Sequence, residues 1–323
     1  MIREILMSVF CTLTISSFSQ TNNDSINKEQ AEKHIFYLAA DRLKGRVNFT
    51  KEQLEVAEYI NKEFFAYGLQ PFPGFTNFYQ PFRTHSDIIL PAYTRCDTLT
   101  DSILYNIVGV LPGSGKDDEI IIFSAHYDHV DKDLQGRGGY IFNGANDDAS
   151  GTTAVLMLAR YFAIRNNNER TIIFCLFAGE ELGLYGSTEF AKLINPGKIK
   201  AVINIEMIGR TNRTGKKAFF VTGSAHSDLM VILEKNLMGE KISIREEGQD
   251  LAGLFYRSDN YSFAKKSIIA HSIMCSDDKE PCYHQPCDDA KRIDIDNMTK
   301  IIQAIASSCK SLISGEDTPK WIK

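Results

Sequence analysis

The chain has 323 residues, of which 43% are hydrophobic and 24% are charged, and its formal net charge is −5. A chain of this length can bury a substantial core in one large domain or in two small ones. The composition excludes a disordered chain, and the slight negative charge gives no indication of a nucleic-acid partner.

Residues 1–20 predict a signal peptide. Arg3 supplies a positive charge, and an apolar run extends from Ile5 to about Phe18 before small polar residues. The run is too short for a comfortable membrane span, and no later segment is long and apolar enough for one. We therefore expect a secreted or periplasmic mature chain with no stable membrane association, in which disulfides are possible. The alternative is a buried N-terminal helix.

The first part of the mature chain, about residues 28–70, is predicted to be helical. Apolar residues recur there at helical spacing, as at Ile35, Leu38 and Ala39. The aromatic segment that follows is broken by proline and glycine and is typical of a loop or an edge strand.

Strand and helix candidates alternate between about residues 105 and 313. The strand candidates are strongly apolar and cover 105–111, 119–125, 171–177, 200–205, 218–222 and 267–273. The helix candidates cover 152–165, 185–193, 226–238, 258–265 and about 294–312. This alternation predicts a single α/β domain over residues 21–323, with a mostly parallel central β-sheet flanked by helices on both faces.

Acidic residues and a histidine follow three of the predicted strands at the points where the strands end. They are His126 and Asp128, the adjacent pair Glu180 and Glu181, and Glu206. Because sites in such sheets form beyond the carboxyl ends of the strands, we expect these side chains to gather there. Each cluster alone also has a plain interpretation, as a helix cap, a surface histidine or a solvated acidic pair. A metal ion would remove the repulsion within a buried acidic pair, leaving one carboxylate as a ligand and its neighbour as a base.

Two further segments carry metal-ligand residue types. Asp147 and Asp148 lie in a glycine-bounded segment before the helix 152–165, and this segment is more acidic than a simple helix cap requires. His284 lies in a turn-rich loop near the final helix, where a lone histidine is usually not a ligand. Taken together, the nitrogen and oxygen donors suit zinc and could accept manganese or cobalt. An HExxH motif is absent, which argues against a thermolysin-like single-zinc site.

In this order and spacing, the five clusters resemble the co-catalytic di-zinc aminopeptidases. That family contains secreted bacterial leucyl-type aminopeptidases and is related to glutamate carboxypeptidases. The resemblance covers about residues 105–305, and Gly45 and Arg46 fit the family's N-terminal part. It implies a zinc-exopeptidase type of fold, two Zn²⁺ ions per chain, and removal of N-terminal amino acids from peptides that have a free N-terminus. It predicts nothing about oligomeric state.

The resemblance also implies a ligand set. Asp147 would bridge both metals, His126 and Glu181 would complete one site, and Glu206 and His284 would complete the other. Glutamate at position 206 departs from the more familiar aspartate, and its extra methylene could change metal spacing or affinity.

Further roles carried over from the family concern residues around these ligands. Glu180 would be the general base and acid, and Asp128 would orient His126. The peptide bond between Asp147 and Asp148 would be cis, and Asp148 itself replaces a usual asparagine.

Cysteines flank the last predicted ligand, as they do in some secreted members of the family. We expect a disulfide between Cys282 and Cys287 that tightens the His284 loop. Free thiols that compete as zinc ligands are the alternative. Cys175, within an apolar strand, is expected to be a buried thiol.

The sequence leaves open several rival functions and the roles of several residues near the expected site. The rival functions are a glutaminyl cyclase working with one zinc, a carboxypeptidase or dipeptidase of the same fold, and a catalytically dead binding module. Clustered arginines would support a carboxypeptidase, and the available ones are Arg210, Arg213 and Arg257. An apolar specificity pocket or the core would hold Phe255, Tyr256 and Tyr283. Asp259 either supports the site or caps the helix that begins beside it.

Overall fold

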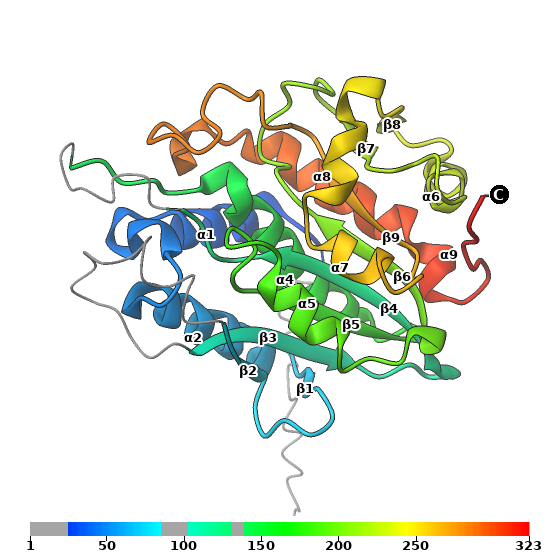
Figure 1. Cartoon of the computed structure of the whole chain (residues 1–323). Coiled ribbons are helices and arrows are strands. Elements are labelled where there is room, and N and C mark those ends of the chain that lie inside the picture. Colours follow the sequence, from blue (N-terminus) through cyan, green and yellow to red (C-terminus); the bar gives the residue numbers. More distant parts are fainter. Residues whose placement is uncertain (1–24, 85–102, 131–138, 323) are drawn as a thin grey trace, which may run out of the picture.

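The computed structural model describes residues 25–84, 103–130 and 139–322 of the chain. The predicted signal peptide, residues 1–20, lies outside these described residues. A nine-stranded sheet runs through the molecule, with helices against both of its faces (Figure 1). None of the helices in the described ranges is long and apolar enough to cross a membrane.

The sheet is mixed, with a parallel centre. Its order is β1-β3-β5-β4-β6-β9-β7-β8, and β2 also pairs with β3. The pairs β5-β4, β4-β6 and β6-β9 are parallel, whereas β3-β5 and β9-β7 are antiparallel. The strands are β1 (Gln70–Pro71), β2 (Tyr79–Arg83), β3 (Ile103–Leu111), β4 (Lys116–His126), β5 (Arg170–Phe177), β6 (Ile199–Ile205), β7 (Ala218–Val221), β8 (Ser243–Arg245) and β9 (Ala270–Met274).

The helices form two layers. The layer on one face contains α1 (Lys28–Leu38), α2 (Lys51–Ala66), α4 (Ser150–Arg165) and α8 (Ile295–Ser308). The layer on the other face contains α5 (Tyr185–Ala191) and α7 (Asn260–Ala264). Two further helices, α6 (Leu229–Leu237) and α9 (Lys310–Ile313), lie near the C-terminal end of the chain.

Successive side chains of the central strands pack alternately into two hydrophobic cores, one on each face of the sheet. In β4, Ile121 and Phe123 pack into the larger core with α4, whereas Ile122 packs into the smaller core with Phe190 of α5. Successive side chains in a strand point to opposite faces, so a strand covered on both faces must be apolar throughout. All eight residues of β5 are buried, and the six from Ile172 to Phe177 are apolar for this reason.

The fold class expected from the sequence is confirmed, and each predicted strand and helix has a counterpart in the structure. The sheet contains antiparallel strands on both sides of its parallel centre, which the sequence pattern did not indicate. The strands β1, β2 and β8 are too short for an alternation of apolar and polar residues to be recognised in the sequence.

Candidate metal centre

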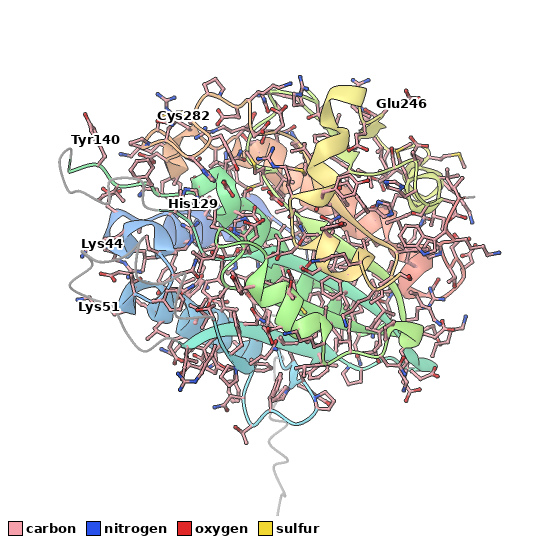
Figure 2. The ribbon with its side chains drawn as sticks, in the orientation of Figure 1. Lys44, Lys51, His129, Tyr140, Glu246 and Cys282 are labelled. Carbon is pink, nitrogen blue, oxygen red and sulfur yellow. A yellow bond between two sulfur atoms is a disulfide. The ribbon has the colours of Figure 1, made fainter. Side chains whose placement is uncertain are left out.

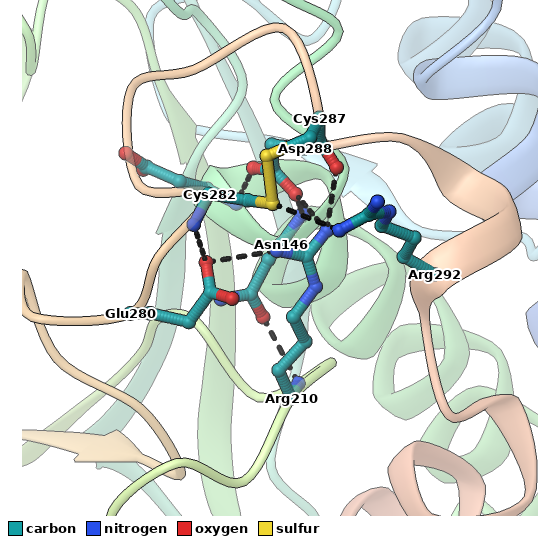
Figure 3. The surroundings of a disulfide bond; sticks show 8 residues. Asn146, Arg210, Glu280, Cys282, Cys287, Asp288 and Arg292 are labelled. Carbon is teal, nitrogen blue, oxygen red and sulfur yellow. Dashed lines mark hydrogen bonds and ion pairs between the residues drawn. A yellow bond between two sulfur atoms is a disulfide. The ribbon is translucent and has the colours of Figure 1, made fainter.

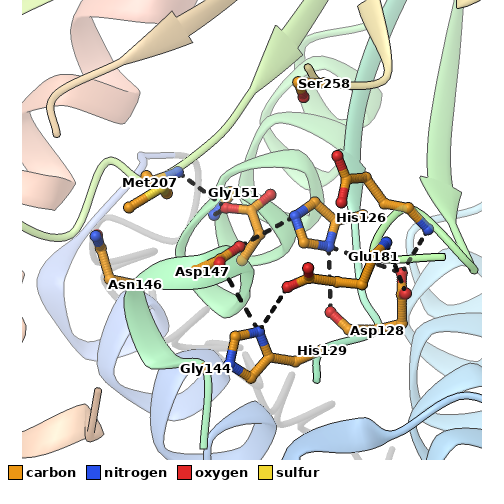
Figure 4. Close-up of polar contacts among 12 residues, drawn as sticks. His126, Asp128, His129, Gly144, Asn146, Asp147, Gly151, Glu181, Met207 and Ser258 are labelled. Carbon is orange, nitrogen blue, oxygen red and sulfur yellow. Dashed lines mark hydrogen bonds and ion pairs between the residues drawn. The ribbon is translucent and has the colours of Figure 1, made fainter. Parts of the chain in front are cut away.

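Asp147 lies at the centre of the site and its carboxylate faces two ways (Figure 4). Oδ1 lies 3.2 Å from Nε2 of His126, and Oδ2 lies 3.0 Å from Nε2 of His284. The residue lies within the short helical turn Ala145–Ala149, and its peptide bond to Asp148 is cis, as the resemblance implied. One carboxylate therefore has its two oxygens available to two separate groups of ligands.

The first group comprises His126, Asp147 and Glu206, whose ligand atoms lie within 4.8 Å of one another. His126 ends β4 and Glu206 directly follows β6, its parallel neighbour, so the sheet itself brings the two together. The ring of His126 is fixed by an interaction between Nδ1 and the backbone oxygen of Asp128 at 3.1 Å. Its Nε2 and Glu206 Oε2 are buried and have no hydrogen-bond partner among the described residues.

The second group comprises Asp147, Glu181, His284 and His129, again within 4.8 Å of one another. His284 Nε2 lies 3.0 Å from Glu181 Oε1, and His129 Nδ1 lies 3.0 Å from the same oxygen. This grouping differs from the division that the resemblance implied. Ligand atoms that lie within 4.8 Å of one another group His126 with Glu206, and Glu181 with His284. Both β5 and β6 are parallel neighbours of β4, so strand order alone does not decide this grouping, and the approach of the His284 loop to Glu181 at 3.0 Å contributes to it.

His129 was not predicted from the sequence. Its side chain is fully buried, and Figure 2 shows it inside the molecule while Lys44 and Tyr140 lie at the surface. A Cβ on Gly144 would lie 2.5 Å from the ring, so only glycine leaves room for it. The signal that could have revealed it is its place three residues after His126 at the same strand end.

Asp128 acts on the backbone as well as beside His126. Its carboxylate lies 3.7 Å from His126 Nδ1, and it accepts hydrogen bonds from the backbone amides of Glu180 at 3.2 Å and Glu181 at 3.3 Å. Asn48 donates a further hydrogen bond to it at 2.6 Å. Asp128 thus ties the end of β4 to the acidic pair that follows β5, and its backbone oxygen is the group nearest the imidazole.

Asp148 accepts hydrogen bonds from the backbone beside the ligand groups. Its Oδ1 accepts hydrogen bonds from the amides of Gly151 at 2.9 Å and Met207 at 3.1 Å. Gly151 has to be glycine, because a Cβ there would lie 2.1 Å from the backbone oxygen of Ile205. The acidic residue at position 148 therefore joins the start of α4 to the segment that carries Glu206.

The predicted disulfide between Cys282 and Cys287 is present and closes the loop that carries His284 (Figure 3). Beside it, Asp288 accepts hydrogen bonds from the amides of Asn146 at 2.9 Å and Asp147 at 3.1 Å. The loop therefore holds the backbone of Asp147 as well as presenting His284. Three buried free cysteines remain in the described ranges, Cys175 among them as expected.

Arg210 connects this loop to the segment that follows Glu206. Its guanidinium lies 2.8 Å from Glu280 and 3.0 Å from Asp288. Its charge is therefore neutralised by two carboxylates next to the loop.

The charges at the site are unbalanced without a cation. Burial raises the pKa of Glu206 to about 7, and burial together with neighbouring carboxylates raises the pKa of Glu180 well above its usual range. Burial lowers the pKa of His284, but Asp147 and Glu181 outweigh it and raise the value to about 9. Excess negative charge in a buried site is relieved by bound cations. Together with the unpartnered His126 Nε2 and Glu206 Oε2, this shows that the residues present fit metal ions.

A cleft of about 460 Å³ opens over the site, and Asp147, Glu180, Glu181 and Glu206 contribute to its floor. Its walls include apolar side chains on one side, namely Met207, Leu254, Met274 and Tyr283.

The structure distinguishes the aromatic residues that line the cleft from those that are buried elsewhere. Tyr256 and Tyr283 line the cleft, whereas Phe255 is buried against Gly223, where a Cβ would lie 2.3 Å from its ring. Asp259 makes no capping hydrogen bond at the start of α7, and burial raises its pKa to about 7. Its interpretation as a helix cap is therefore wrong.

The three arginines do not cluster at the cleft. Arg257 lines it and pairs with Asp278. Arg213 pairs with Asp277 at 2.8 Å, and neither Arg213 nor Arg210 is among the residues that line it.

Residues 106–309 match the model of Peptidase family M28, so the chain belongs to this family. This confirms the resemblance found in the sequence.

Three relatives illustrate the similarity. Aminopeptidase YwaD of Bacillus subtilis is 25% identical over 240 residues, which cover 72% of this chain and 50% of that protein. The chain thus spans about half the length of this curated relative. Among solved structures, the zinc aminopeptidase BSAP from Bacillus subtilis matches with a TM-score of 0.71 at 16% identity, covering 92% of this chain and 98% of that one. The Porphyromonas gingivalis glutaminyl cyclase matches with a TM-score of 0.67 at 14% identity, covering 90% and 100%.

Proposed function

We propose that this chain is a zinc-dependent aminopeptidase that removes N-terminal amino acids from peptides. The observation that carries the proposal is the Asp147 carboxylate, whose two oxygens face two separate groups of ligand residues beneath an open cleft. Membership of Peptidase family M28 and the likeness to YwaD support this activity.

Two zinc ions would be held by five side chains. His126, Asp147 and Glu206 form one set of ligands, and Asp147, Glu181 and His284 form the other. The donors are imidazole nitrogens and carboxylate oxygens, at the buried positions where unpaired charge is otherwise costly.

His129 has a different role in this proposal. A ligand histidine usually donates its second ring N–H to an outer partner, as His126 does through Nδ1 to Asp128. His129 Nε2 has no hydrogen-bond partner among the described residues, and its Nδ1 lies 3.0 Å from Glu181 but 3.8 Å from Asp147. We therefore assign Nδ1–H as a hydrogen-bond donor that orients Glu181.

The chemistry divides between the metals and Glu180. Zinc ions bound here would polarise the scissile carbonyl and lower the pKa of water. Glu180, which lines the cleft, accepts a proton from the attacking water and then donates it to the leaving amine. Burial and the neighbouring carboxylates raise its pKa, which favours its holding a proton between the two transfers. Asp128 holds the backbone amide of Glu180 and so sets where that carboxylate stands.

The cleft also indicates a class of substrate. Glu206 supplies negative charge near one metal position, which suits a free α-amino group. The apolar wall formed by Met207, Leu254, Met274 and Tyr283 suits an apolar first side chain. Arg257 lines the cleft but is paired with Asp278. Among the described residues, the cleft therefore has no cluster of unpaired arginines that would bind the terminal carboxylate of a carboxypeptidase substrate.

The test is a substrate panel run on wild type and Glu180→Gln. Leucine, methionine, lysine and glutamate anilides are assayed alongside N-acetylated controls. We expect cleavage of free-amine substrates only, fastest for leucine and methionine. Glu180→Gln should lose at least about 100-fold in kcat with its zinc retained, because proton transfer is typically worth 10²–10⁴-fold. The exposed Glu246→Gln is the matched control and should keep wild-type rates.

Other results would assign a different activity. Cyclisation of N-terminal glutamine without anilide cleavage would favour a glutaminyl cyclase, which the structural likeness to such enzymes also allows. Cleavage that requires a free C-terminus would favour a carboxypeptidase. No turnover after zinc addition would leave a binding module.

We also infer that the protein is exported. The disulfide between Cys282 and Cys287 is the supporting observation, because disulfides persist in oxidising compartments. Residues 1–20 would be the signal peptide, and mass determination of the mature N-terminus from an exporting host tests this.

A further inference from the structure

Arg46 is one of two arginines in the described ranges whose side chains are almost wholly buried, the other being Arg170. A buried guanidinium needs its N–H groups satisfied, since unpaired buried donors are costly. Arg46 donates only to backbone oxygens: Nε to Tyr127 at 2.8 Å, Nη1 to Leu38 at 2.9 Å and to Asn143 at 2.5 Å, and Nη2 to Gly144 at 2.9 Å.

Three of these oxygens belong to segments that carry proposed metal ligands. Tyr127 lies between His126 and Asp128, and Asn143 and Gly144 directly precede the turn that contains Asp147. One rigid side chain therefore joins the end of β4 to the Asp147 segment.

The backbone around Arg46 is shaped for this position. Gly45 and Arg46 have φ values of 76° and 57°, in the left-handed region that residues with a Cβ rarely adopt. A Cβ on Gly45 would lie 2.3 Å from the backbone oxygen of Phe142, so glycine allows the close approach to the 143–144 segment.

The neighbouring residues extend the same contact. Val47 forms a bridge with His129, and Asn48 donates to Asp128 and accepts a hydrogen bond from the amide of Gly179 at 3.0 Å. Residues 46–48 thus touch each segment that carries a ligand except the Glu206 and His284 segments.

The charge of Arg46 has no hydrogen-bonded carboxylate. Burial lowers the pKa of Arg46, and the carboxylates that oppose this are Asp288, Asp147, Asp128 and Asp148. Its counter-charges are therefore acidic groups in and around the metal centre, which it attracts before any cation is bound.

We propose that Arg46 is a positioning residue that holds the His126–Asp128 and Asp147 segments in their metal-binding arrangement before metal arrives. This rests on the metal centre proposed above. The guanidinium fork makes the arrangement possible, because a lysine ammonium is a single point that cannot reach all four oxygens.

The test compares Arg46→Lys with Arg170→Lys. Arg170 begins β5, roughly 23 Å along the strand from its carboxyl end, and pairs with Glu119 and with the backbone oxygens of Leu312 and Asp317. Both variants keep their charge and lose hydrogen bonds from a buried side chain. Zinc affinity is measured by chelator competition and stability by thermal unfolding.

We expect both variants to unfold at lower temperature but only Arg46→Lys to lose zinc affinity, by at least about 10-fold, as for other residues that support metal ligands. Equal affinity in Arg46→Lys and wild type, or an equal loss in Arg170→Lys, would overturn the role. A wild-type protein that binds no zinc would instead overturn the metal centre, and this role with it.

A measurement on wild type covers the case in which Arg46→Lys does not fold. Hydrogen exchange is followed by mass spectrometry in peptides covering 125–130 and 142–148, with zinc removed and with zinc restored. Slow exchange in both states supports positioning by Arg46. Exchange that becomes slow only with zinc would show that the metal arranges these segments, which contradicts the proposal.

Discussion

At the scale of single residues, the site depends on which atom of each side chain faces which neighbour. Asp147 uses both oxygens, His126 uses Nε2 because Nδ1 is engaged with a backbone oxygen, and His129 uses Nδ1. The conformation of the surrounding backbone determines which atom of each side chain faces its neighbour. On the assignment proposed above, His129 would orient Glu181 although it lies only three residues from the proposed ligand His126.

The assignment of His129 predicts how two substitutions differ. His129→Ala removes the N–H that faces Glu181 and should weaken zinc binding by about 10–100-fold. His129→Asn keeps an amide N–H near the position of Nδ1 but offers zinc a much poorer donor, so it should retain most of the affinity. Chelator competition on both variants is the measurement. If His129→Asn is as weak as His129→Ala, the ring nitrogen binds the metal directly.

A second histidine, remote from the site, predicts a pH dependence of stability. His271 is buried, with Nδ1 2.7 Å from the backbone oxygen of Thr222 and Nε2 2.7 Å from the hydroxyl of Ser227. Burial lowers its pKa to about 4, from about 6.5 in the unfolded chain. The folded-state pKa is depressed, so the contribution is complete above pH 6.5 and is lost as the pH falls toward 4, about 3 kcal/mol in all.

Urea unfolding of wild type and His271→Gln at several pH values between 7 and 4, with chelator present, tests this. The stability of wild type should fall more steeply than that of the variant, by about 1.4 kcal/mol per pH unit. Parallel curves would show that His271 is not the titrating group.

At the scale of secondary-structure elements, the positions of polar residues at the ends of predicted strands indicated which side chains would lie close together. His126, Glu180, Glu181 and Glu206 follow apolar runs that form the parallel centre of the sheet, so position in the sequence specified position in space. The pairing of ligands was not predictable in the same way. It depends on which strands are neighbours and on how a distant loop folds back to Glu181, and neither is encoded in local spacing.

The disulfide that closes the His284 loop is expected to affect both the stability of the protein and its affinity for zinc. The disulfide closes a short loop, and replacing both cysteines by alanine should lower the free energy of unfolding by about 2 kcal/mol through loop entropy. Zinc binding should weaken as well, because the loop presents His284 and its Asp288 holds the amide of Asp147. Urea unfolding and zinc titration measure the two effects. Unchanged zinc affinity would mean that the contacts of Asp288 and Arg210 hold the loop without the disulfide.

At the scale of the whole molecule, segments far apart in the sequence meet at one edge of the sheet. The N-terminal residues Arg46 and Asn48 donate hydrogen bonds to Tyr127 and Asp128, about 80 residues further along the chain and next to the proposed ligand His126. A helical period predicted the helices on either side of them, but no local pattern indicates that the turn between these helices reaches the metal centre. The same holds for the antiparallel strands that flank the sheet's parallel centre, since strand direction follows from the path of the connections.

Anomalous diffraction at the zinc edge from crystals of the zinc-loaded protein would locate the metal ions directly. We expect two peaks on either side of Asp147, one beside His126 and Glu206 and the other beside Glu181 and His284. A single peak would contradict the two-metal centre and favour the single-zinc chemistry of a cyclase. No peak at this edge of the sheet would remove the metal centre altogether.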